Sequence, residues 1–173
     1  SQAEHDPRAA VFLITPDKDF GLAVQKEMEN QMKELSRYEI MKSSVDQYAK
    51  AFLCKDAEQC FDIVNKIAPE HLEVELPDPK KYLPLIYNAG AIFLGKYTSE
   101  PIGDYMAGPN HTLPTSGTAA FSSPLGVYDF VKHSSVECYS EEAFRNISKK
   151  VQLFANAEGL TAQAHAREVR DEE

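Results

Sequence analysis

Short apolar runs rich in branched residues alternate with segments of helical periodicity along the first half of the sequence. This alternation is the feature that most constrains the fold. Strands are expected at residues 10–15, 48–54 and 91–94, and helices between them at 17–35, 56–67 and 82–86. A βαβαβ order is typical of a parallel sheet, because the helix after each strand brings the chain back to the end of the sheet where that strand began, so that the next strand runs in the same direction.

The sequence changes character after Gly95. Residues 96–124 carry many Gly, Pro, Ser and Thr residues with little periodicity, so a long functional loop is expected there. Beyond it we expect a short helix at 125–131, an extended segment at 135–139 and a helix at 140–154 that opens with a Ser-Glu-Glu cap signal. The predicted fold class is α/β: part of a Rossmann-like parallel sheet domain plus a small C-terminal helical appendage.

Composition and charge exclude several classes of partner. The 173 residues are 43% hydrophobic, which is enough to bury a substantial core. The net charge of -9 and the scattered Lys and Arg residues argue against a nucleic-acid partner. No apolar run approaches the roughly 20 residues that span a bilayer. Residues 1–8 are too polar for a signal peptide, so we expect a cytoplasmic protein with no membrane partner.

The three cysteines, Cys54, Cys60 and Cys138, are an odd number without C-x-x-C spacing. This pattern favours reduced, structural thiols over a disulfide framework or a zinc knuckle. The chain begins with Ser1 and not with Met, and we therefore expect that the gene product extends upstream.

A carboxylate and an imidazole stand side by side at Glu70 and His71. Pro69 disfavours helical geometry at Ala68, so the pair is expected where a helix ends and the chain turns. Such a pair can divide acid–base work if the two pKa values are separated by their surroundings. An ordinary structural role at a helix terminus is the alternative.

Other polar residues could complete a metal and acid–base site. Gln2 and His5 share one face if they are helical, and could supply half of a metal site, although terminal pairs of this kind are usually exposed. Asp104 lies between glycines that allow close approach of a ligand, but it could instead cap a turn. His111 lies in the same Gly/Pro-rich loop, whereas His133 is interpreted as a surface residue.

Five long motifs stand out: QAEHD at 2–6, APEHL at 68–72, NAGAIFLG at 88–95, GDYMAGPNH at 103–111 and the run 113–130. Together they resemble the second half of histidinol dehydrogenase. The resemblance implies a zinc-dependent, NAD-linked enzyme that oxidises L-histidinol to L-histidine through L-histidinal, the last step of histidine biosynthesis. It also implies a homodimer with exchanged tails. Residues 1–123 would be the second half of the catalytic α/β domain, with the zinc and substrate site, and 124–173 the mainly helical tail.

The resemblance also implies roles for single residues. Gln2, His5 and Asp104 match zinc ligands, and the family's fourth ligand is a His in the tail. His71 matches the base that takes the alcohol proton, and Glu70 matches the residue that activates water for the second oxidation. The substrate contacts implied are Gln2, His5, His71, Asp104, His111, Glu158 and His165.

The tail departs from the family pattern where Glu158-Gly159-Leu160-Thr161-Ala162 continues into Gln163. If Gln163-Ala164 is a two-residue insertion, His165 becomes the fourth ligand, and we prefer this interpretation. Gln163 is the alternative, because two added residues rotate a helix face by about 200°. A second departure is Ala120, where the family usually carries a basic residue.

The family's first half, which holds most of the nicotinamide-binding module, has no counterpart in this sequence. No Gly-rich dinucleotide fingerprint occurs in it. We therefore expect a fragment or split product that does not bind NAD usefully by itself, whose partner is a second copy or the missing N-terminal half. The alternative function is a non-catalytic remnant that serves as an interaction or assembly module.

Overall fold

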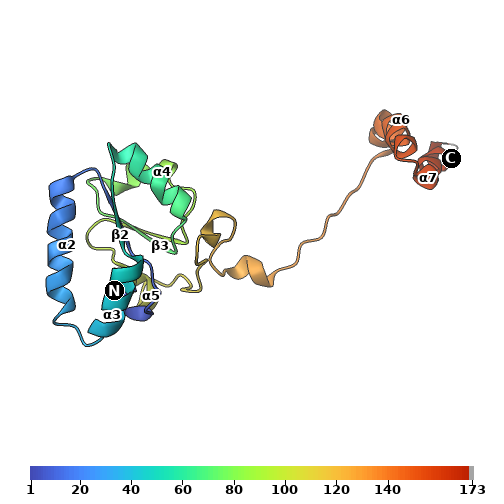
Figure 1. The fold of residues 1–173 in the computed structure, drawn as a ribbon. Helices are drawn as coiled ribbons and strands as arrows, with labels where there is room; N and C mark the ends of the chain where they lie inside the picture. Colours follow the sequence, from blue (N-terminus) through green and yellow to red (C-terminus); the bar gives the residue numbers. More distant parts are fainter. Residues whose placement is uncertain (172–173) are drawn as a thin grey trace. The chain divides into compact units, whose positions relative to one another are not determined.

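The computed structural model describes residues 1–171, whose contacts form two compact units (Figure 1). Unit 1 is Ser1–Phe130, and unit 2 begins at Val131. The domain boundary predicted after residue 123 falls seven residues before this division. The functional roles predicted for the two domains stay a prediction.

Unit 1 contains four short parallel strands. Strand β1 (Phe12–Thr15) pairs with β2 (Lys50–Leu53), and β3 (His71–Val74) pairs with β4 (Ala91–Leu94). The α/β class and the parallel pairing are therefore confirmed. The strands form two separate two-stranded sheets.

Five α-helices accompany these strands within the described part of unit 1: α1 (Gln2–His5), α2 (Lys18–Met32), α3 (Tyr38–Tyr48), α4 (Ala57–Ile67) and α5 (Glu100–Tyr105). Side chains cap two of them. The Asp17 carboxylate accepts from the Phe20 N–H at 3.0 Å, and the Asp56 carboxylate accepts from the Gln59 N–H at 2.8 Å. Short 3-10 helices lie at Pro79–Leu85, Thr118–Ala120 and Val127–Phe130.

Three elements correct the sequence prediction. Helix α3 was not predicted, and Tyr48, expected to open a strand, is its last residue. Strand β3 was not predicted either, because its four residues include the polar His71 and Glu73. Helix α5 lies inside the segment expected to be a loop.

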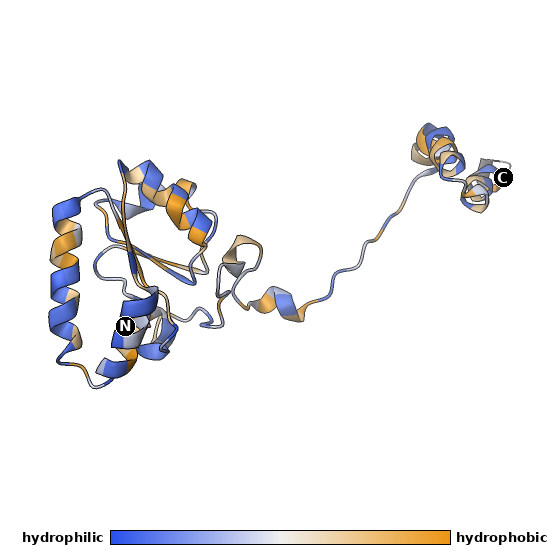
Figure 2. Ribbon diagram, viewed as in Figure 1, coloured by the Kyte–Doolittle hydropathy of each residue, from blue (hydrophilic) through white to orange (hydrophobic). Residues whose placement is uncertain are grey.

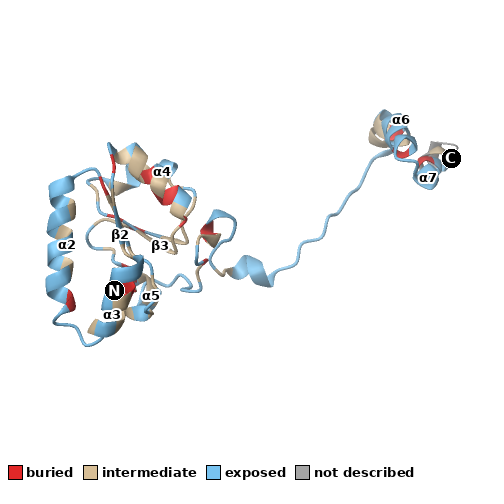
Figure 3. Ribbon diagram, viewed as in Figure 1, coloured by how far each residue is buried: buried red, intermediate tan, exposed pale blue. Residues whose placement is uncertain are grey.

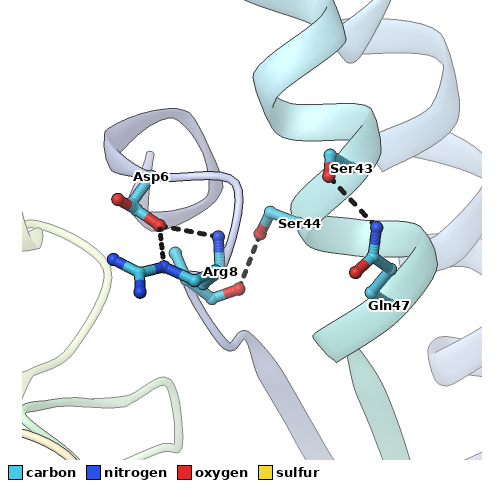
Figure 4. A network of polar contacts seen from close by, with 6 residues as sticks. Asp6, Arg8, Ser43, Ser44 and Gln47 are labelled. Atoms are coloured by element: carbon cyan, nitrogen blue, oxygen red, sulfur yellow. Dashed lines mark hydrogen bonds and ion pairs between the residues drawn. The ribbon is translucent and has the colours of Figure 1, made fainter.

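Helix α1 is held against the core by apolar packing and by one buried hydrogen bond. Ala3, Met32 and Met41 form a buried cluster that joins α1, α2 and α3. The Ser44 hydroxyl, fully buried on α3, donates to the Ala9 carbonyl at 2.7 Å (Figure 4). This bond fixes the chain just after α1, because it satisfies both polar groups away from water.

The turn that leaves α1 is stabilised by Asp6. Its carboxylate accepts from the backbone N–H of Arg8 at 2.8 Å and from Arg8 Nε at 3.2 Å (Figure 4). The backbone hydrogen bond, reinforced by the guanidinium, holds the pKa of Asp6 below its ordinary value. The two contacts define where α1 ends.

Unit 2 contains α6 (Glu141–Ala157) and α7 (Thr161–Asp171), and residues 131–140 before them form no helix or strand. The Ser140 hydroxyl accepts from the Ala143 N–H at 3.2 Å, which confirms the predicted cap signal. Figures 2 and 3 show that both helices are amphipathic and that few of their residues are buried. Among the side chains whose burial the structure describes, the buried ones in these helices are Ser148, Ala155 and Ala164. None of the described helices is both long and apolar enough to cross a bilayer.

The three thiols differ in exposure and in acidity. Cys54 is buried, Cys60 is half-buried, Cys138 is exposed, and all three are free, as predicted. Burial, followed by a hydrogen bond with Cys54, raises the pKa of Cys60 to about 12. Cys60 is therefore protonated, and a poor nucleophile, at neutral pH.

Alkylation of the native protein with iodoacetamide at pH 8 should accordingly modify Cys138 first. Because only the thiolate reacts, and the greater nucleophilicity of a thiolate of higher pKa compensates only partly for its scarcity, Cys60 should react more than about tenfold more slowly than an ordinary exposed thiol. Peptide mapping by mass spectrometry after timed quenching measures the rates, and urea should equalise them. Equal native rates at Cys60 and Cys138 would contradict this assignment.

Candidate metal and acid–base site

Three ionisable side chains converge where strand β3 begins and helix α5 passes it. One ligand atom each from His71, Glu100 and Asp104 lie within 4.8 Å of one another. Glu100 and Asp104 are four residues apart on α5, so both carboxylates point from the same face of that helix. Two carboxylates and an imidazole at this separation can bind a divalent cation.

His71 is positioned by the way the chain leaves α4. The helix ends at Ile67, and Ala68 adopts a left-handed conformation with φ of 49°. The backbone then runs beside the segment that enters β4: the Gly90 N–H donates to the Pro69 carbonyl at 2.9 Å, and the Ala91 N–H donates to the Glu70 carbonyl at 2.8 Å. The predicted helix end is confirmed, and His71 is the first residue of a strand.

Gly90 permits this close approach. A Cβ atom at this position would lie 2.6 Å from the Glu70 carbonyl oxygen and 3.2 Å from the ring of Pro114. No side chain fits between two backbones at this distance. The location of Glu70 and His71 therefore depends on a glycine twenty residues away in the sequence.

The Phe93 ring lies beside His71 and against helix α5, which carries Asp104. It is buried, its centroid is 6.0 Å from the His71 ring centroid, and a Cβ atom at Gly103 would lie 2.6 Å from its Cε1 atom. Helix α5 therefore packs directly on Phe93 at the residue before Asp104. This contact sets how closely the Asp104 carboxylate approaches His71.

Glu100 is a member of the site that sequence reasoning missed. It is 7% exposed, and its Oε2 accepts from the Ser1 hydroxyl at 2.7 Å. Its backbone N–H donates to Glu73 Oε1 at 2.8 Å. The Ser-Glu-Pro start of a helix, one turn before Asp104, was the signal that could have identified it.

Two buried polar atoms of the described residues have no hydrogen-bond partner: Gln2 Oε1 and His71 Nδ1. Leaving such an atom unpaired costs about 1–3 kcal/mol, so each requires an explanation. A bound ligand or cation would explain the unpaired Gln2 Oε1 atom. Gln2 directly follows Ser1, whose hydroxyl donates to Glu100. An oxygen and imidazole donor set is one that zinc accepts.

The other predicted site residues are distributed over both units. Glu70 and Gln2 are half-buried, while His5 and His111 are exposed. Gln2 and His5 occupy one helical turn, as predicted. The structure thus brings His71 and Asp104 together, and connects α1 to them through Ser1 and Glu100.

Three further predicted residues lie in unit 2. Glu158 is the C-cap of α6, and Gln163 and His165 are exposed on α7. His165 Nδ1 lies 3.2 Å from the Glu168 carboxylate. The choice between His165 and Gln163 as a ligand stays a prediction.

Known proteins resemble this chain along its whole length. A family model described as histidinol dehydrogenase matches residues 1–171. The histidinol dehydrogenase of Aquifex aeolicus is 50% identical over 170 residues, which cover 98% of this chain and 40% of that relative. That of Bacillus licheniformis is 49% identical over 173 residues, or 100% of this chain and 41% of the relative.

A solved structure shows the same fold. The crystal structure of histidinol dehydrogenase from Elizabethkingia anophelis superimposes with a TM-score of 0.91 at 33% identity, covering 98% of this chain and 39% of that one. The chain therefore spans about 40% of the length of the curated relatives it matches.

Proposed function

Since the chain belongs to the histidinol dehydrogenase family, we propose that it supplies the zinc, substrate and acid–base part of an enzyme that oxidises L-histidinol to L-histidine with NAD. The observation that carries this proposal is the convergence of His71, Glu100 and Asp104 within 4.8 Å. The orphaned oxygen of Gln2, in the helix connected to Glu100 through Ser1, supports it.

The residues of this chain fit a zinc ion. Gln2, His5 and Asp104 would hold it, with His165 as the fourth ligand, contributed through an exchanged tail. When bound, zinc supplies a positive charge that keeps the amine and imidazole of histidinol in one orientation. The orphaned Gln2 Oε1 and the half-buried Asp104 carboxylate are the donors in unit 1 that support this assignment.

His71 acts as the base of the first oxidation. It accepts the proton of the substrate hydroxyl while a hydride leaves the carbon that bears this hydroxyl, and the product is the aldehyde L-histidinal. Glu70 accepts a proton from the water that adds to this aldehyde, and loss of a second hydride then yields the carboxylate. NAD, when bound, accepts the hydride of each oxidation.

The remaining residues bind substrate. His111, in the Gly/Pro-rich segment, and Glu158, at the end of α6, are proposed to contact histidinol. The partner is a second copy that exchanges its tail, or an upstream half of the enzyme, in the cytoplasm. We do not favour a non-catalytic module, because a scaffold gains nothing from buried polar atoms without a hydrogen-bond partner.

Turnover tests the proposed function. We expect the gene product at full length, loaded with zinc, to reduce two NAD molecules for each L-histidinol consumed. The absorbance of the reduced NAD measures this turnover. The 173-residue chain alone should show no turnover and no NAD binding with a micromolar dissociation constant, because it has no Gly-rich dinucleotide fingerprint.

Two results would count against this assignment. Zinc-loaded full-length protein that leaves L-histidinol unchanged would overturn the proposed activity. Micromolar NAD binding by the isolated chain, measured by calorimetry, would contradict the proposed division of labour.

A further inference from the structure

We propose that Glu100 is a positioning residue for His71: its carboxylate accepts a hydrogen bond from the imidazole and fixes the tautomer that leaves the other ring nitrogen free to act as base. This inference rests on the proposed role of His71. It assigns to Glu100 a role distinct from that of a zinc ligand.

The distances bring the two groups together. A ring nitrogen of His71 and a carboxylate oxygen of Glu100 are at most 4.8 Å apart, and His71 Nδ1 is buried without a partner. Hydrogen bonds of catalytic groups are often long before substrate binds, and shorten in the complex. The unpartnered Nδ1 atom and the nearby Glu100 carboxylate are therefore the two groups that the inference joins.

Glu100 is held more firmly than a surface carboxylate. The Ser1 hydroxyl donates to its Oε2 atom at 2.7 Å, and Glu73 Oε1 accepts from its backbone N–H at 2.8 Å. Glu73 belongs to the same strand as His71, two residues further on. The carboxylate thus stands where α1, β3 and α5 meet, and its Oε1 atom is not engaged by Ser1.

The chemistry explains why a carboxylate is needed at this place. A neutral imidazole carries its proton on either ring nitrogen, and the hydrogen bond made by one nitrogen decides the state of the other. A carboxylate that accepts from Nδ1–H leaves Nε2 as the proton acceptor. Asp104 would be engaged with zinc, which leaves Glu100 as the carboxylate for His71.

The decisive experiment measures the tautomer directly. Hydrogen–nitrogen correlation spectra of the imidazole rings are recorded on the zinc-loaded 173-residue chain, without and with L-histidinol, at a pH of about 8, where imidazole is neutral. The His71 signals are identified by their absence from His71→Asn. We expect the Nδ1–H form in the native chain and a mixture of both tautomers in Glu100→Gln.

Kinetics on the zinc-loaded full-length protein supply the second readout. In Glu100→Gln, kcat should fall roughly 10- to 100-fold, the usual effect of removing an orienting partner, while KM and zinc affinity change less than about threefold. Glu75→Gln is the matched control, because it removes one charge from an exposed position directly after β3. It should keep the native tautomer and kcat.

An unchanged tautomer in Glu100→Gln overturns the inference, and so does a loss of zinc affinity as large as the loss of kcat. If Glu100→Gln does not fold, as judged by circular dichroism, Ser1→Ala replaces it and should give a partial tautomer mixture. A native protein without turnover refutes the proposed function, whereas the spectra still decide the Glu100–His71 contact.

Discussion

Asp104→Ala should abolish saturable binding of L-histidinol to the zinc-loaded protein. Asp104 lies on α5 with its carboxylate within 4.8 Å of ligand atoms of His71 and Glu100. Asp104 is the one carboxylate among the proposed zinc ligands, so the substitution removes the negative charge that this group of ligands supplies. Loss of a residue that only hydrogen-bonds to a metal ligand lowers metal affinity about 10- to 100-fold. Because Asp104 is itself a proposed ligand, we expect its loss to lower zinc affinity at least about 100-fold.

Isothermal calorimetry measures this effect, with zinc titrated first and L-histidinol second. Asp62→Ala is the matched control, since it removes the same charge from an exposed position on α4. A chelator should abolish histidinol binding to the native protein. Native histidinol affinity in Asp104→Ala would refute the assignment of Asp104 as a ligand.

Gly90→Ala should destabilise unit 1 and displace the acid–base pair. The added Cβ would lie 2.6 Å from the Glu70 carbonyl oxygen, which itself accepts the Ala91 N–H. Backbone atoms held by hydrogen bonds yield less than a flexible side chain, so the strain is not relieved locally. Overpacking of this kind costs about 1–3 kcal/mol of the free energy of unfolding.

Urea denaturation followed by circular dichroism measures that free energy, and histidinol calorimetry reports on the site. Gly21→Ala is the control, because Gly21 lies in α2 and its Cβ would meet only Thr15 Cγ2, at an ordinary 3.6 Å. It should leave stability unchanged or raise it by up to about 1 kcal/mol. Equal stability of Gly90→Ala and the native protein would contradict the close approach described above.

Local signals were sufficient for much of the fold. Strands near 12–15, 50–53 and 91–94 follow from short branched runs, and α2, α4 and α6 follow from helical periodicity, with Ser140 as the predicted cap of α6. Parallel pairing follows from their alternation. These features depend on residues close together in the sequence, and could therefore be predicted.

The candidate site was only partly visible in the same way. Glu70, His71 and Asp104 stood out as polar residues in apolar or glycine-rich surroundings, and the motifs around them indicated the family. Nothing in that pattern stated which groups touch. Glu100 was overlooked because a glutamate before a proline is ordinary until its burial is known.

The sequence by itself determined the class of fold, the family and the residue types of the site, since each is carried by local periodicity or by contiguous motifs. Only the tertiary structure decided that His71 opens a strand, because four residues that include two polar ones pair solely through contact with β4. It also decided that Ser1, Glu73 and Glu100 meet. Glu100 is 99 positions from Ser1 and 27 from Glu73, and local sequence patterns do not indicate hydrogen bonds between residues so far apart.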